Sequence, residues 1–129
     1  MPTRPPRRRL AVVDVDAGVG RGVALRVAAE ADLEVVATTA DARATAGVPL
    51  DAVVLSARRV DDAVLAALAK AARTHPGVPV VVVSLDDSAA CPSEGSATAF
   101  VSMHDGDDAL LAVLREVCDR RAGTPCGRC

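Results

Sequence analysis

Short apolar runs alternate with polar, helix-like segments along the whole chain. The runs that predict β-strands cover residues 10–15, 33–37, 52–55, 80–83 and 99–101. The third and fourth runs are continuously apolar, which is typical of central parallel strands buried on both faces. This alternation predicts an α/β fold built on a parallel sheet.

Between these runs, apolar residues recur at helical spacing in three stripes. The stripes are Val19, Val23 and Val27; Val60, Val64 and Leu68; and Leu110, Leu114, Val117 and Cys118. Each stripe predicts a helix that faces the sheet. Asp61–Asp62 lie at the start of the second stripe and Asp107–Asp108 precede the third, where carboxylates cap free amides and oppose the helix dipole. Gly123 and Pro125 are predicted to end the last helix.

Two of the connections carry helix breakers. Residues 41–50 contain Gly47 and Pro49, and residues 86–98 contain Pro92, Gly95 and three serines. Glycine and proline disfavour helix, so each segment is predicted to hold a turn of helix or little more.

Composition and charge exclude several functions. The 129 residues fit one domain, and half are hydrophobic, but the single aromatic, Phe100, leaves no surface on which bases could stack. The net charge is −2, although Arg4, Arg7, Arg8 and Arg9 all lie in the first nine residues. Without these four, eleven basic residues oppose seventeen acidic ones. Such a surface repels phosphate backbones, so we expect no direct binding to nucleic acid.

The sequence is predicted to contain no membrane or export segment, and its two ends are predicted to be tails outside one domain. No apolar run approaches the roughly 18 residues of a membrane span, and none follows Arg7–Arg9 as an export signal requires. We therefore expect a cytoplasmic protein with no membrane contact. Residues 1–8 are predicted to be a disordered basic tail, residues 9–122 one domain, and residues 123–129 a flexible tail.

The C-terminal tail carries Cys126 and Cys129 in a CxxC pattern. Zinc requires four ligands, and a redox pair lies at a helix N-terminus, so neither site is complete here. A shared metal or an intermolecular disulfide remains the alternative to a plain tail.

Candidate chemistry gathers where the predicted strands end. Ligands bind open parallel sheets at the carboxyl ends of the strands. The residues at these ends are Asp14, Thr38, Ser56, Ser84 and Met103. Asp16 follows the first strand, and Asp86 and Asp87 follow the fourth. These carboxylates suit a hard cation, but as turn and capping residues they need no ion.

Five stretches carry a family resemblance: VVDVDAGVGRGVAL (12–25), DLEVVATTAD (32–41), DAVVLS (51–56), HPGVPVVVVS (75–84) and AFVSMHDGDDALLAVL (99–114). Over residues 9–121 the chain resembles the receiver domains of two-component response regulators, most closely those that precede helix-turn-helix output domains. The resemblance implies a flavodoxin-like (CheY-like) α/β/α sandwich. Its five-stranded parallel sheet would have the order 2-1-3-4-5, with the second and fourth helices shortened.

The resemblance also implies a phosphorylation site, from which this sequence departs. Receivers accept a phosphoryl group from a histidine kinase on an aspartate that ends the third strand, beside Mg²⁺, an acidic pair and a lysine. Here Ser56 stands at the acceptor position, Val15 at the second acid and Met103 at the lysine. Asp14 matches the first acid. Ser84 matches the hydroxyl residue that contacts the phosphoryl group, and Phe100 matches the switching aromatic.

These replacements remove the groups that the chemistry needs. A carboxylate forms the acyl phosphate, a divalent ion bridges oxygens, and a cation neutralises the transferring group. We therefore predict no phosphotransfer, no tightly bound Mg²⁺, no cofactor and no catalytic residue. Ser56 is interpreted as a hydrogen-bonded structural serine. Its phosphorylation by a kinase is the alternative, which the charge of Asp14 would oppose.

The sequence thus favours a pseudo-receiver that regulates through protein–protein contact, with a partner or a second copy, at the face of the fifth strand and last helix. One alternative is a metabolite sensor with a pocket lined by Asp14, Ser56, Ser84 and Met103. Another is a nucleotide-binding protein that uses Gly18, Gly20 and Gly22, although Val23 stands where the third required glycine should be. His75 and His104 have no matched nucleophile and are not assigned to catalysis.

Overall fold

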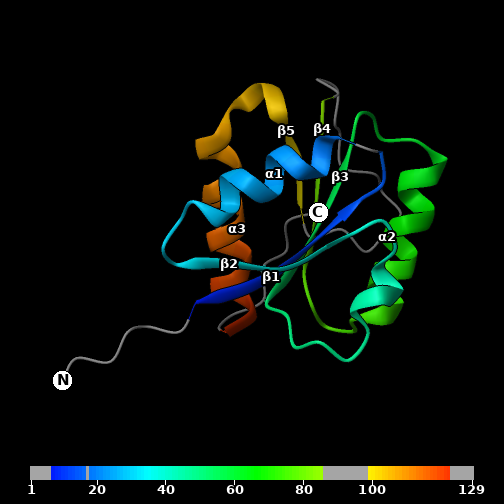
Figure 1. The fold of residues 1–129 in the computed structure, drawn as a ribbon, viewed down its shortest axis with the longest axis horizontal. Helices are drawn as coiled ribbons and strands as arrows, with labels where there is room; N and C mark the ends of the chain where they lie inside the picture. The colour runs from blue at the N-terminus through cyan, green and yellow to red at the C-terminus, as the bar shows by residue number, and fades with distance from the viewer. Residues whose placement is uncertain (1–6, 17, 86–98, 123–129) are drawn as a thin grey trace.

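The computed structural model describes residues 7–16, 18–85 and 99–122, arranged as one sheet between two helical layers (Figure 1). The elements are β1 (Arg8–Asp14), α1 (Val19–Ala28), β2 (Leu33–Thr39), η1 (Ala42–Thr45), β3 (Ala52–Ala57), α2 (Asp62–Thr74), β4 (Val80–Ser84), β5 (Ala99–Ser102), η2 (Met103–Asp105) and α3 (Asp107–Ala122), where η marks a 3₁₀ helix. All strand pairs are parallel, in the order β2-β1-β3-β4-β5. This confirms the predicted α/β/α fold. The expectations for residues 1–6, 86–98 and 123–129, including the shortened fourth helix, lie outside the described residues.

The sheet separates two hydrophobic layers. Helices α1 and α3 cover one face, on which Val12, Val54 and Val83 are buried. Helix α2 and η1 cover the other face, on which Val13, Leu55 and Val82 are buried. Strands β3 and β4 are buried along their whole length, which explains why their sequences are continuously apolar.

Local sequence signals account for where the helices begin. The Asp61 carboxylate accepts a hydrogen bond of 3.1 Å from the Val64 amide, which confirms the predicted cap of α2. Val60, predicted as part of this helix, precedes the cap and packs against the α2-side core. The segment 41–50 holds only the four-residue η1, as Gly47 and Pro49 indicated.

The end of each strand differs from the predicted end by one or two residues, and the boundaries of β1 and β5 change the account of named residues. Strand β1 begins at Arg8, inside the expected tail, because Arg8 pairs with Leu33 of β2 and its guanidinium lies 3.0 Å from Asp119 of α3. Strand β5 ends at Ser102, so Met103 opens η2 instead of closing the strand. The Ser102 hydroxyl accepts a hydrogen bond from the His104 amide and caps that turn.

Within the described parts of the chain, none of the helices is both long enough and apolar enough to cross a bilayer.

Candidate functional site

Asp14 and Ser56 are neighbours at the carboxyl edge of the sheet. They are paired in register across β1 and β3, and the alternation of side chains places both on the face that α1 covers. Ser56 is completely buried. Its hydroxyl lies 3.4 Å from the carbonyl oxygen of Val13 and 3.4 Å from Oδ1 of Asp14, so it is held by two long hydrogen-bond contacts.

The start of α1 occupies the remaining sides of Asp14. The amide of Gly18 donates to Oδ2 at 3.2 Å, and the amide of Gly20 donates to Oδ1 at 3.1 Å. The first amides of a helix have no partner within the helix, and they carry its positive dipole end. Both oxygens of the Asp14 carboxylate accept hydrogen bonds from these amides, so they stabilise the start of α1.

Gly20 is the residue that makes this close approach possible. A Cβ built at Gly20 would lie 2.7 Å from Cβ and Cγ of Asp14 and 2.7 Å from Oγ of Ser56. The backbone of α1 therefore fills the space directly above Ser56. Gly18 has a positive φ of 101°, whereas a Cβ at Gly22 would meet open space. The first two glycines thus have structural explanations that do not involve a nucleotide.

Asp16 and Val15 make their contacts outside this cluster. Asp16 accepts a hydrogen bond of 2.9 Å from the Arg58 amide and so joins the loops after β1 and β3. The side chain of Val15 packs on the α2 side of the sheet. Among residues 7–16, 18–85 and 99–122, no three His, Cys, Asp or Glu side chains gather where a metal ion could be held. The proposed contribution of Asp86 and Asp87 lies outside those residues.

The sheet itself separates the other residues matched to the receiver site. Ser84 is in register with Ala57, one residue beyond Ser56, so its buried side chain belongs to the α2 face. Phe100 packs on that same face, whereas Met103 packs against the α1 and α3 layer. The structure therefore brings Asp14 and Ser56 together and places Ser84 on the opposite side.

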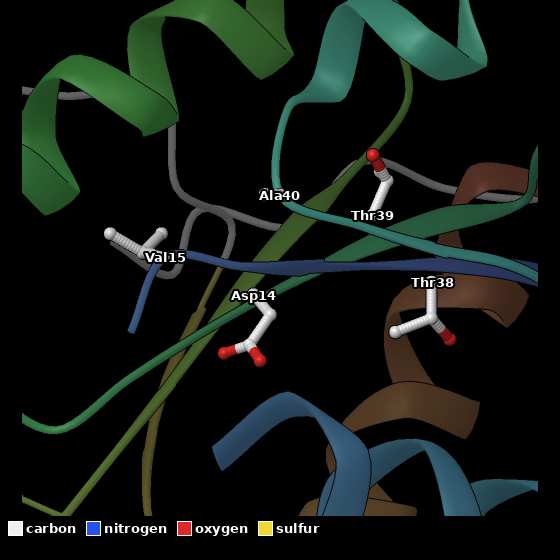
Figure 2. Close-up of a pocket in the computed structure, with 5 residues that line it drawn as sticks. All are labelled: Asp14, Val15, Thr38, Thr39 and Ala40. Carbon is white, nitrogen blue, oxygen red and sulfur yellow. The ribbon is translucent and has the colours of Figure 1, made fainter. Parts of the chain in front are cut away.

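An open pocket of about 380 Å³ lies beside Asp14, lined also by Val15, Thr38, Thr39 and Ala40. Asp14 and Thr38 point toward α1, whereas Val15 and Thr39 point to the other side of the sheet (Figure 2). This pocket lies over the ends of β1 and β2. Thr38 was predicted as a strand end, whereas Thr39 and Ala40 carry no sequence signal of the kind used to predict the site.

His75, which looked isolated in the sequence, has a buried structural role. Its Nε2 lies 2.8 Å from the hydroxyl oxygen of Thr45, and that hydroxyl donates its proton to the carbonyl oxygen of Ala42 at 2.7 Å. Since the hydroxyl has only one proton, Nε2 of His75 must be the donor in this pair. Burial lowers the pKa of His75 from its ordinary value, because desolvation disfavours the charged ring.

An ion-pair network joins α3 to α1 and to the start of β2. Arg115 lies 2.7 Å from Glu30 and 2.9 Å from Asp32, and Arg26 bridges Glu30 and Asp107. Hydrogen bonds from Arg115 are the largest cause that lowers the pKa of both Glu30 and Asp32. One edge of α3 is therefore held by contacts within the domain.

Comparisons with known proteins identify the fold. No protein-family model matches the sequence, and none of the curated proteins matches it. A CheY-like receiver domain protein from Methanospirillum hungatei JF-1 is 19% identical, with a TM-score of 0.69 over 90% of this chain and 97% of that one. The receiver domain of an HD domain-containing protein from Pseudomonas fluorescens Pf-5 is 18% identical, with a TM-score of 0.71 over 95% and 94%. The response regulator domain of Thermotoga maritima CheB is 22% identical, with a TM-score of 0.68 over 88% and 97%. This chain therefore has the fold of response regulator receiver domains.

Proposed function

We propose that this chain is a pseudo-receiver, a signalling domain of the two-component type that regulates by binding a protein and transfers no phosphoryl group. The observation that carries the proposal is the contact of α1 with Asp14 and Ser56. Working receivers need an open carboxylate at this edge. Here the corresponding serine is buried beneath Gly20, and two helix amides occupy the neighbouring Asp14.

The chemistry of the site supports the same conclusion. The one carboxylate beside the Ser56 hydroxyl, that of Asp14, already accepts hydrogen bonds from two helix amides, which weakens it as a base. No donor reaches the buried Ser56 without displacing the start of α1. The side chain of Val15 supplies no oxygen for a divalent ion, and the side chain of Met103 supplies no cation for a transferring phosphoryl group. In this proposal the domain is not an enzyme and uses no cofactor.

The binding face is assigned to β5 and α3. The edge of α3 that carries Arg115 is engaged with the loop between α1 and β2. On β5, Phe100 is half-buried on the α2 side of the sheet. On α3, Val113 lies about 200° around the helix from Arg115 and is only half-buried, as is Ala109. This incompletely covered apolar surface suits a partner protein or a second copy of the chain.

The proposal also retains the expected cytoplasmic location, which fractionation of the native cells would test.

Substitution on this face tests the proposed contact. Ala109→Arg places a long charged side chain on the proposed face, and Ala69→Arg places the same side chain on an exposed position of α2. We expect the first variant to abolish self-association or partner capture and the second to preserve it, with light scattering after size exclusion and affinity capture as the assays. Equal behaviour of the two folded variants would contradict the assignment of the face.

A metabolite sensor is the second candidate, and the open pocket beside Asp14 and Thr38 favours it. This pocket replaces the one first expected around Ser56 and Ser84, because those two side chains are buried on opposite faces. A thermal-shift screen of metabolites, repeated with Thr38→Val, would support this candidate if a ligand stabilised only the unsubstituted protein.

A further inference from the structure

A second pocket lies on the α2 side of the molecule, where η1 packs beside α2 (Figure 1). Its volume is about 310 Å³, and it is lined by Arg43, Lys70, Arg73 and Thr74. Three of these four side chains are cationic, although the protein as a whole is acidic. These three cations form a local region of positive charge on a protein whose net charge is negative.

Carboxylates neutralise only part of this charge. Asp41 lies 3.6 Å from Nη2 of Arg43 and 3.6 Å from Nζ of Lys70, near the outer limit for ion pairs. Its shorter bond, 3.0 Å, goes to the amide of Arg43 and caps η1. Within the described residues, no carboxylate lies within ion-pair distance of Arg73. One negative group therefore opposes three positive ones.

The framework holds these cations around one space. Lys70 and Arg73 are three residues apart on α2, so they lie on the same side of the helix. Arg43 belongs to η1, which is fixed to the end of α2 by the bond between Thr45 and His75. The Thr74 hydroxyl already donates to the Lys70 carbonyl at 2.8 Å, so recognition in this pocket depends on the cations.

We propose that this pocket binds a compact phosphate-bearing anion. Guanidinium groups present paired N–H donors that match phosphate oxygens, and an ammonium adds a point charge. The lining residues include no aromatic side chain on which a nucleobase could stack, and the sequence has only one aromatic, Phe100. The ligand is therefore a small di- or polyanion, such as a diphosphate or a phosphorylated metabolite without a base. This site is separate from Asp14 and Ser56, and its test does not depend on the pseudo-receiver proposal.

Inorganic pyrophosphate is the probe, titrated into the full chain by calorimetry, with amide NMR shifts to locate the site. Arg73→Gln is expected to weaken binding about tenfold, because it removes a charge-assisted contact. Arg21→Gln removes an exposed arginine on α1 and is expected to leave the affinity within about twofold. Asp41→Asn retains the η1 cap but removes the competing charge, so it is expected to tighten binding.

These variants separate a site from general attraction to surface charge. Saturable binding that Arg73→Gln weakens, Asp41→Asn strengthens and Arg21→Gln leaves unchanged would support the proposal. Equal losses in Arg73→Gln and Arg21→Gln would overturn it. Displacement of pyrophosphate by chloride at matched ionic strength, or no saturable binding in the millimolar range, would also overturn it.

Discussion

The close contact between α1 and Ser56 makes a quantitative prediction about Gly20→Ala. The new methyl group would lie 2.7 Å from two carbons of Asp14 and from Oγ of Ser56, distances that require α1 to move. Overpacking of this kind costs about 1–3 kcal/mol, and loss of the Gly20 amide bond to a charged acceptor costs about 1.5–3 kcal/mol. The higher helix propensity of alanine offsets about 0.5–1 kcal/mol of this destabilisation. Because partial movement relieves some of the clash, we expect a net destabilisation of about 2 kcal/mol.

Gly22→Ala is the matched control in the same helix. Its methyl group would meet nothing within 4 Å, so only the propensity gain remains, and we expect a stabilisation of about 0.5–1 kcal/mol. The free energy of unfolding is best measured by urea denaturation with far-UV circular dichroism, because the protein has no Trp or Tyr. If Gly20→Ala proved as stable as Gly22→Ala, α1 would not pack on Asp14 and Ser56 as described.

Three further predictions follow from other contacts. Ser56→Asp should destabilise the fold and still accept no phosphoryl group from acetyl phosphate, because it buries a second carboxylate beside Asp14; a phosphorylated product by intact mass would contradict this. Because the folded-state pKa of His75 is lowered, its contribution to stability is full above its ordinary value of 6.5 and is lost as the pH falls below it. The free energy of unfolding, measured with urea, should therefore fall between pH 6.5 and 4.5, before the carboxylates titrate. His75→Gln retains a donor to Thr45 but does not titrate, so its free energy of unfolding should change less with pH in this range. Arg115→Gln should lower the urea midpoint, and the difference from the unsubstituted protein should shrink as sodium chloride is added; a salt-independent loss would contradict an ionic role.

The sequence predicted the fold well because each strand is marked locally. The continuous apolar runs at β3 and β4 follow directly from burial on both faces. The Asp61 cap involves only the segment from Asp61 to Val64, so it could be predicted from local sequence. The strand order came from the family resemblance, since local patterns contain no information on which strands are neighbours. Arg8 was assigned to the tail because the partner of its guanidinium, Asp119, is 111 residues away.

The candidate site was harder to predict, because it depends on register and on tertiary distance. Ser56 and Ser84 were both predicted to close strands, but β3 continues to Ala57, and this one-residue offset places the two serines on opposite faces. Gly20 was visible as part of a glycine pattern, yet its need for a missing Cβ appears only when α1 lies on β1 and β3.

The role of His75 and the basic pocket also lay beyond the sequence. The partner of His75, Thr45, is 30 residues away in the chain. Arg43 and Arg73 are equally far apart, and neither lies at a strand end, where ligands of open parallel sheets are expected.

The most direct test of the central claim is intact-mass analysis of the full chain after incubation with acetyl phosphate and Mg²⁺. The enclosed serine and the occupied Asp14 predict an unchanged mass and an unchanged amide NMR spectrum under these conditions. Stoichiometric, Mg²⁺-dependent addition of one phosphoryl group, removed by hydroxylamine as an acyl phosphate would be, would contradict the account.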